Sequence, residues 1–489
     1  MTGVQTCALP IFLLRGGRIV NSDEEYVGDI LIENGIIVKI GKDLKSENAD
    51  VIDCTGKFVI PGGIDPHTHI QMQGAVYRVC DDWLSGTQAA AAGGTTCVLD
   101  FVPINRGDKP KECLLDWEEQ AKKSVIDYSF HMSVVDWNEE VRESVELAIA
   151  HGINSAKIYL AYKGNLMLKT EEDFIEFFDF AAKHGILPQV HCEDGDLVPY
   201  LQNKLFNKGK TTPASHPLSR PNYVEEKGVK TAIAMAKATD CPVYIVHNTC
   251  REAIRAVENG SSNKYPVFGE CTISHLVYND AMNSNENFDV AAGAVLSPPL
   301  RSESDRVALW DALHRGTIKT ICTDHCPWTL EQKRDGINDF RKIPNGVPAI
   351  EERMVLAWSY GVDKGLISPM EYVAVTSTNA AKIFGLYPRK GVIHENSDAD
   401  IVIIDPNAKR VITKDAQKCA CDYNLFEGVE VRGIPIITIS GGRIVWKCDV
   451  INNIAQYKKG YITDESCGRF VKREPFTPYV YGRDRKSVV

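Results

Sequence analysis

The sequence predicts an α/β protein: a (β/α)8 TIM barrel with a small β-sandwich domain formed from both termini. Three observations predict it. Eight short apolar segments recur along the chain, helix-like segments lie between most of them, and both ends are rich in strands and turns with almost no helical pattern. Eight buried strands alternating with helices favour a barrel, although the count alone leaves a doubly wound open sheet possible.

The eight predicted strands are apolar and rich in β-branched residues. They cover residues 57–69, 95–102, 127–135, 155–162, 187–194, 241–249, 265–275 and 318–326. The helical segments between them have apolar residues at helical spacing and a glycine close behind the last turn. The clearest of these cover residues 81–94, 139–152, 170–185 and 303–316. In the third of them, Thr170 and Asp173 have the form of a capping box.

The two ends of the chain predict a second domain. Residues 12–56 and 396–446 are strand-like, and each contains the element GGRIV, at 16–20 and 441–445. One sandwich built from both ends, with the barrel inserted between them, is the economical arrangement. The predicted boundaries are 12–60 and 386–450 for the β-sandwich, 61–385 for the barrel, and 451–482 for an extended C-terminal arm that lies on something else.

Composition excludes several classes of partner. The 489 residues carry a formal net charge of −10, which argues against nucleic acid or an anionic membrane as the main partner. Fifteen cysteines are scattered through apolar segments without a C-x-x-C pair, as in reduced cytosolic proteins. The N-terminal stretch CALPIFLL is short and broken by Pro10, so we expect no signal peptide or membrane span, and a soluble cytoplasmic protein.

Polar residues gather where the predicted strands end. In a (β/α)8 barrel, the C-terminal ends of the strands meet at one mouth, where functional groups collect. Each residue alone could be a hydrogen-bonded structural residue, but their joint placement predicts a metal site. The candidates are His67 and His69 on the first strand, Lys157 on the fourth, His191 on the fifth, His247 on the sixth and Asp324 on the eighth.

Lys157 is the unusual member of this set. An ammonium group has no lone pair to offer and is repelled by metal ions. Three interpretations stay open on residue chemistry: a buried neutral base, a salt-bridged structural lysine, or a lysine carboxylated by carbon dioxide. The last would turn a cation into a carboxylate able to bridge two divalent ions.

Eight motifs resemble one protein family over nearly the whole chain, from about Phe12 to Gly482. They are PGGIDPHTH, AGGTTCVLDFV, SAKIYLAYKG, QVHCEDGDL, YIVHNT, VLSPPLR, CTDHCPW and KIPNGVPAIEERM. This set resembles the dihydropyrimidinase and D-hydantoinase branch of the cyclic amidohydrolases. The resemblance implies a barrel with a β-sandwich, two divalent metal ions per chain, most often Zn²⁺, N6-carboxylation of Lys157 as their bridge, and a homotetramer.

The resemblance also implies which residues hold each metal. His67 and His69 would hold one ion together with Asp324, and His191 with His247 would hold the other. The ends "MTGVQTCALPI" and "RDRKSVV" do not match the family and resemble translated adapter sequence, so residues 1–11 and 483–489 are expected to be non-native.

The implied reaction is hydrolytic ring opening of a cyclic amide or ureide. Asp324 would act as general base and then general acid, and Tyr162 would donate a hydrogen bond to the developing oxyanion. Ser297 and Asn345 match substrate-contacting positions of the family, where the contact can run through backbone atoms. No nucleic-acid or membrane partner is expected, only a small cyclic substrate.

The expected substrate is a 5,6-dihydropyrimidine, with dihydrouracil giving N-carbamoyl-β-alanine. The alternatives are a D-hydantoinase acting on 5-substituted hydantoins, then an allantoinase, a dihydroorotase, a deaminase or a non-catalytic scaffold homologue. The preference depends on the segment QGAVYRV, where Gln73 and Arg78 would make the pocket wall less apolar if they face it. If they face solvent instead, they carry no information on the substrate.

Overall fold

The barrel predicted from the sequence is present in the computed structural model, which describes residues 9–74, 76–262 and 265–476. Neighbouring strands pair in parallel and in chain order from β6 to β13. A bridge between Thr68 and His325 joins the last strand region to the first. The strands are β6 (Gly63–Thr68), β7 (Thr95–Phe101), β8 (Asp127–Ser133), β9 (Ser155–Tyr159), β10 (Leu187–His191), β11 (Val243–Ile245), β12 (Val267–Thr272) and β13 (Ile318–Cys322).

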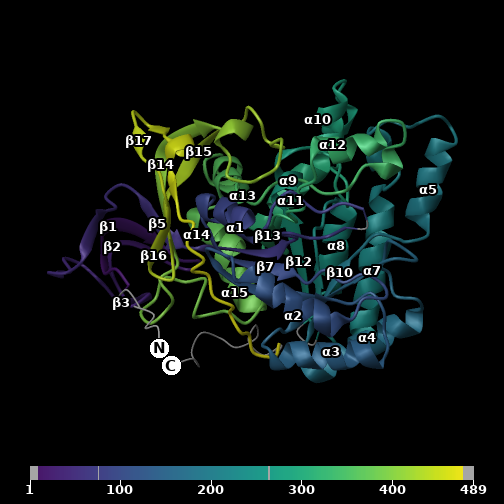
Figure 1. Ribbon diagram of the computed structural model, residues 1–489, viewed down its shortest axis with the longest axis horizontal. Coiled ribbons are helices and arrows are strands. Elements are labelled where there is room, and N and C mark those ends of the chain that lie inside the picture. Colours follow the sequence, from purple (N-terminus) through teal and green to yellow (C-terminus); the bar gives the residue numbers. More distant parts are fainter. Residues whose placement is uncertain (1–8, 75, 263–264, 477–489) are drawn as a thin grey trace, which may run out of the picture.

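Helices cover the outside of the barrel (Figure 1). Those following the strands are α1 (Trp83–Ala92), α2 (Pro110–Ala121), α3 (Glu139–Ala150), α4 (Glu171–His184), α7 (Asn222–Ala238), α8 (Arg251–Gly260) and α11 (Glu303–His314). Shorter ones are α5 (Leu197–Phe206), α6 (Ser215–Leu218), α9 (Ile273–Val277), α10 (Phe288–Gly293), α12 (Leu330–Lys333), α13 (Arg353–Ala357), α14 (Pro369–Val373) and α15 (Asn379–Ile383).

Helix α4 shows how the sequence sets such an element. Thr170 accepts a hydrogen bond from the backbone of Asp173 and the Asp173 side chain returns one, which confirms the capping box. The helix ends at Gly185, whose φ of 68° is a left-handed conformation that glycine adopts without a Cβ penalty. Phe174 and Phe177 on its inner face are buried in the core around the barrel.

The second domain is a mainly antiparallel sheet built from both ends of the chain, which confirms the predicted fold class. In Figure 1 its N-terminal strands (purple) and C-terminal strands (yellow) lie together at one side of the barrel. The two parts join where β5 pairs with β14. The strands are β1 (Phe12–Val20), β2 (Glu25–Glu33), β3 (Ile36–Gly41), β4 (Asp50–Asp53), β5 (Phe58–Pro61), β14 (Ile401–Val411), β15 (Glu430–Ser440), β16 (Arg443–Lys447), β17 (Val450–Ile451), β18 (Ile454–Ala455) and β19 (Tyr461–Ile462).

The segment 57–69, expected as one strand, divides between the two sheets. β5 belongs to the terminal sheet and β6 begins the barrel, with the division at Gly62. A Cβ at Gly62 would lie 2.0 Å from the Thr96 hydroxyl oxygen, so only glycine allows the chain to pass this close to β7. The apolar character of both halves hid this division, because both are buried.

Of the predicted C-terminal arm, the part described after β19 lies on the barrel of its own chain, whereas β18 and β19 belong to the terminal sheet. Residues 463–476 run across the end of the barrel where the strands begin. The backbone N–H of Val471 donates to Tyr128 O at 2.8 Å, and that of Phe476 donates to Gly185 O at 2.6 Å. The arm therefore covers the end opposite to the mouth where the candidate residues lie.

Two further expectations concern the ends of the chain and the absence of a membrane span. Of the predicted non-native ends, residues 1–8 and 483–489 lie outside the described residues. Residues 9–11 are described, and the Ile11 carbonyl accepts a hydrogen bond from the backbone N–H of Asp50 at 2.9 Å. Among the residues described, none of the helices is both long and apolar enough to span a membrane.

Candidate active site

All nine residues predicted from the sequence as site residues line one cavity at the C-terminal mouth of the barrel. The cavity has a volume of about 140 Å³. The nine residues are His67, His69, Lys157, Tyr162, His191, His247, Ser297, Asp324 and Asn345. The remaining lining is mostly apolar and includes Met72, Tyr159 and Leu166.

His67, His69 and Asp324 form the first group of potential ligands. Asp324 Oδ1 lies 3.2 Å from His67 Nε2 and 3.2 Å from His69 Nε2. The ends of β6 and β13 are held together by the backbone N–H of Asp324, which donates to His67 O at 3.0 Å. The three side chains offer two imidazole nitrogens and one carboxylate oxygen within 4.8 Å of one another.

His191 and His247 form the second group. His191 Nδ1 lies 3.0 Å from His247 Nε2. His191 Nε2 lies 3.0 Å from the Glu193 carboxylate, which accepts a hydrogen bond and so leaves the His191 Nδ1 lone pair toward His247. His247 Nδ1 is buried and has no hydrogen-bond partner among the described residues.

Lys157 lines the same cavity as both groups and lies beside the first. Its Nζ is 3.4 Å from His67 Nε2, and the side chain is fully buried. Burial, the largest cause, lowers the pKa of Lys157 to about 8. Burial thus favours the uncharged amine, which is the form that can react with carbon dioxide.

This donor set fits divalent cations. Four imidazoles and one carboxylate converge in one buried space, and zinc sites in proteins are built from these ligand types. Without a cation, His247 has two possible tautomers. With its proton on Nδ1, the lone pairs of His191 Nδ1 and His247 Nε2 face each other. With its proton on Nε2, His247 donates to His191, but the buried lone pair of His247 Nδ1 has no donor. A cation held by the facing nitrogens removes this conflict.

Two glutamates orient the histidines, and neither was predicted from the sequence. Glu270 Oε1 lies 2.7 Å from His67 Nδ1, so the proton sits on Nδ1 and the Nε2 lone pair faces the cavity. Glu193 orients His191 in the opposite tautomer, with the proton on Nε2 and the Nδ1 lone pair toward His247, and is itself paired with Arg220 at 2.5 Å. A signal was available for both: Glu193 stands two residues after His191, and Glu270 is a charged residue inside the apolar segment 265–275.

Three of the cavity residues have backbone conformations that L residues rarely adopt. The φ angles are 62° for Tyr162, 37° for His247 and 51° for Asp324. Such conformations cost free energy, of order 1–3 kcal/mol each, and they concentrate at functional sites. Their position at three strand ends aims the side chains into the cavity rather than along the strands.

The loop after β6 corrects one interpretation. Gln73 and Arg78 are exposed and neither lines the cavity, so they do not make its wall less apolar. Tyr77 is directed away as well, since its hydroxyl donates to Asp335 at 2.7 Å. From this loop it is Met72 that faces the cavity. Gln73 and Arg78 therefore give no information on substrate choice.

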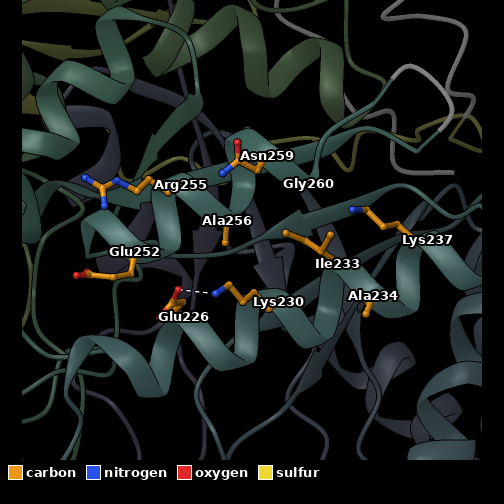
Figure 2. A pocket seen from close by; sticks show the side chains of 10 residues that line it. All are labelled: Glu226, Lys230, Ile233, Ala234, Lys237, Glu252, Arg255, Ala256, Asn259 and Gly260. Atoms are coloured by element: carbon orange, nitrogen blue, oxygen red, sulfur yellow. Dashed lines mark hydrogen bonds and ion pairs between the residues drawn. The ribbon is translucent and has the colours of Figure 1, made fainter.

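A larger hollow of about 420 Å³ lies between α7 and α8 (Figure 2). Its described lining contains no histidine or cysteine. Its Lys230 is mostly exposed and pairs with Glu226 at 2.6 Å, as the dashed line in Figure 2 marks. This hollow lacks converging chemical groups, so it is not the candidate active site despite its size.

A third group of potential ligands, Asp81, His325 and Cys419, is a hydrogen-bonded network. His325 Nδ1 accepts from the backbone N–H groups of Ala349 and Ile350 at 3.1 and 3.3 Å. Its proton therefore sits on Nε2, which donates to Asp81 at 2.9 Å. The imidazole keeps no free lone pair for a metal.

Comparisons with known proteins agree with this geometry. Residues 58–445 match the amidohydrolase family. The chain is 38% identical to a dihydropyrimidinase of Arabidopsis thaliana, over 99% of this chain and 90% of that one. It is 37% identical to a D-hydantoinase of Geobacillus stearothermophilus, over 96% and 98%.

Solved structures give the same result. A dihydropyrimidinase from Brevibacillus agri superposes with a TM-score of 0.89 at 39% identity, covering 96% of this chain and 99% of that one. A D-hydantoinase from Thermus sp. superposes with a TM-score of 0.90 at 35% identity, covering 95% and 99%. The amidohydrolase family uses divalent metal ions, in agreement with the donor set described above. The chain therefore belongs to the amidohydrolase family and is a cyclic amidohydrolase of the dihydropyrimidinase and D-hydantoinase group.

Proposed function

We propose that this protein is a two-zinc hydrolase that opens 5,6-dihydropyrimidine rings, converting dihydrouracil and water into N-carbamoyl-β-alanine. The observation that carries the proposal is that the nine residues predicted to bind metal or substrate line one cavity of about 140 Å³. Its histidines and carboxylate suit Zn²⁺, which binds nitrogen and oxygen ligands in buried sites. Cytoplasmic location and assembly as a homotetramer form part of the same proposal.

In this proposal, His67, His69 and Asp324 would hold one ion, and His191 and His247 would hold the other. Lys157, as N6-carboxylysine, would supply a carboxylate ligand to both. The amine nitrogen forms a bond to the carbon of carbon dioxide and releases one proton, which leaves a carbamate anion. The cation that would repel metal ions thereby becomes a bridging anion, and the low pKa of Lys157 supports this step.

When bound, the two ions activate a water molecule and polarise the ring carbonyl. Asp324 takes a proton from the attacking water and returns it to the ring nitrogen as the C–N bond breaks. The Tyr162 hydroxyl donates a hydrogen bond to the carbonyl oxygen as negative charge develops on it. The backbone near Ser297 and Asn345 orients the –CO–NH–CO– edge of the ring.

The substrate preference is supported by the size of the cavity and by the names of the relatives. A space of about 140 Å³ suits a small ring better than one with an aryl substituent. Relatives from plant, rat and slime mould are named dihydropyrimidinase. Dihydrouracil and dihydrothymine are therefore the preferred substrates in this proposal.

D-hydantoinase activity is the second candidate function. The wall formed by Met72, Tyr159 and Leu166 is apolar enough to bury a 5-substituent, at about 25 cal/mol per Å² of apolar surface. Allantoinase activity has no specific observation in its favour. A non-catalytic scaffold would not need a complete set of ligands, whereas every ligand position is filled here.

Replacing Lys157 by alanine tests the metal bridge. We expect Lys157→Ala to lose most of its metal and activity, because no bridging anion remains between the ions. Short carboxylic acids should restore part of both, since they supply a carboxylate to the vacated space. Wild-type metal content and turnover in this variant would refute the carboxylated bridge.

A comparison of five rings tests the substrate. The measurement is kcat/KM of the metal-loaded protein for dihydrouracil, hydantoin, phenylhydantoin, allantoin and dihydroorotate. We expect dihydrouracil to give the highest value. A clear preference for phenylhydantoin would refute the substrate assignment and leave the reaction class intact, whereas inactivity on all five would favour the scaffold.

A further inference from the structure

Lys333, at the end of α12, is a lysine buried without a carboxylate. Its side chain is fully buried, and no ion pair joins it to an acidic group anywhere in the described ranges. Its Nζ donates instead to two backbone carbonyls, Val295 O and Pro344 O, each at 3.0 Å. Lys333 does not line the cavity, so it has no direct contact with a ring bound there.

The two carbonyls belong to the two loops that carry Ser297 and Asn345. Val295 stands two residues before Ser297, and Pro344 stands directly before Asn345. The backbone N–H of Gly346 also donates to Val295 O at 3.0 Å, so the loops touch at the atom that Lys333 holds. One amine therefore sets the spacing between two loops that enter the cavity from different parts of the chain.

Trp328 holds the Asn345 loop from a second direction. Its indole N–H donates to Asn345 O at 2.8 Å. The next residue, Gly346, has a φ of 131°, and a Cβ there would lie 2.5 Å from Cys326 O. The backbone at Asn345 is thus fixed by a lysine, an indole and a glycine that no side-chain-bearing residue could replace.

Burying this lysine is costly for the fold. Burial, the largest cause, lowers the pKa of Lys333 to about 7. A methionine has a similar shape and would remove the desolvation cost, because it carries no amine. The lysine contributes what methionine cannot, namely donors directed at both loops.

We propose that Lys333, assisted by Trp328, is a positioning residue that holds the Ser297 and Asn345 loops at the spacing required to bind the –CO–NH–CO– edge of the substrate. The inference rests on the proposed function, because it takes the backbone of these loops as the substrate contact. It adds a requirement for a residue that touches neither substrate nor metal ligands.

The test compares Lys333→Met with the wild type in dihydrouracil and hydantoin hydrolysis. Losing both donors lets the loops shift, and displacements near 1 Å can cost about a hundredfold in rate or binding. We expect KM to rise about tenfold or more, because contacts to the edge are made in the ground state as well as the transition state. Metal content should stay at the wild-type value, and kcat should change by about threefold or less.

Two further variants make the result specific. Lys319→Met removes another largely buried lysine, on β13 and away from both loops, and is expected to keep the wild-type KM. Trp328→Phe removes the indole donor to Asn345 and should raise KM in the same direction. It carries the test if Lys333→Met does not fold.

The outcomes separate this inference from the proposed function. A wild-type KM in folded Lys333→Met, or in Trp328→Phe where Lys333→Met does not fold, would overturn the positioning role. An equal rise of KM in Lys319→Met would overturn it as well. A wild-type protein that opens none of the rings would refute the proposed function and this inference together.

Discussion

Replacing Glu270 by glutamine changes the charge behind His67 and little else. Burial raises the pKa of Glu270, but His67 and its other hydrogen-bond donors more than offset this, and the pKa lies below its usual value. The carboxylate is therefore charged. It accepts from His67 Nδ1 at 2.7 Å, from the Tyr244 hydroxyl at 2.7 Å and from His247 N at 3.1 Å.

Glutamine can keep most of these hydrogen bonds. Its amide oxygen can face His67 and the His247 backbone, while its NH₂ group faces the Tyr244 hydroxyl. That hydroxyl can turn to donate to Thr320, whose oxygen lies 2.6 Å away. The fold should hold, and the loss is the negative charge that makes His67 a better ligand.

The expected magnitude follows from that loss. Removing such a partner of a metal-binding histidine typically lowers metal affinity by about 10- to 100-fold. This corresponds to about 1.4 to 2.7 kcal/mol of binding free energy. The effect should fall on metal affinity first and on activity only through metal occupancy.

The assay is competition for Zn²⁺ between the protein and a chelator of known affinity, with circular dichroism as a check on folding. Glu352→Gln is the matched control. Glu352 is also a buried carboxylate, but it pairs with Arg410 and lies outside the cavity lining. Equal zinc affinities of Glu270→Gln and wild type, or an equal loss in the control, would refute the reasoning.

Three more predictions concern catalysis, acid stability and assembly. Tyr162→Phe should lower kcat by about 10²- to 10³-fold with unchanged metal content, because an oxyanion donor is lost; a wild-type kcat would contradict this. Burial raises the pKa of Asp127, but Lys390 and Arg469 draw it well below its usual value. A carboxyl group whose pKa is lower in the folded than in the unfolded protein stabilises the fold at pH values above its unfolded pKa of about 3.9. This stabilisation is lost as the pH falls. The gap in unfolding free energy between wild type and Asp127→Asn, measured by urea titration, should therefore shrink below about pH 4. A constant gap down to about pH 2 would contradict that account. Light scattering should give four times the mass of one chain, and a monomer mass would refute the homotetramer.

The sequence predicted the barrel because its strands are buried on both sides and alternate with amphipathic helices. In such a fold the strand ends share one mouth, so residues as distant as His67 and Asp324 could be expected to meet. The division of segment 57–69 was not predictable from hydrophobicity. It depends on a close approach at Gly62 that appears only when β7 lies beside it.

The partners of the candidate residues were harder to predict than the residues themselves. Glu270 lies on β12, 203 residues after the histidine that it orients, and only the barrel brings the two together. Gln73 and Arg78 show the opposite relation, because they are close to the His67–His69 motif in the sequence but their side chains are exposed to solvent. Chain proximity to a motif does not determine which side of a loop faces the cavity.

Titrating the metal-free protein with Zn²⁺, while following bound metal and dihydrouracil hydrolysis together, tests the central claim most directly. The account predicts about two ions per chain and ring opening that reaches its maximum only when both have bound. Bicarbonate should be needed for full activity if Lys157 is carboxylated. Full hydrolysis by the metal-free protein, or saturation of both signals at one ion per chain, would contradict the account.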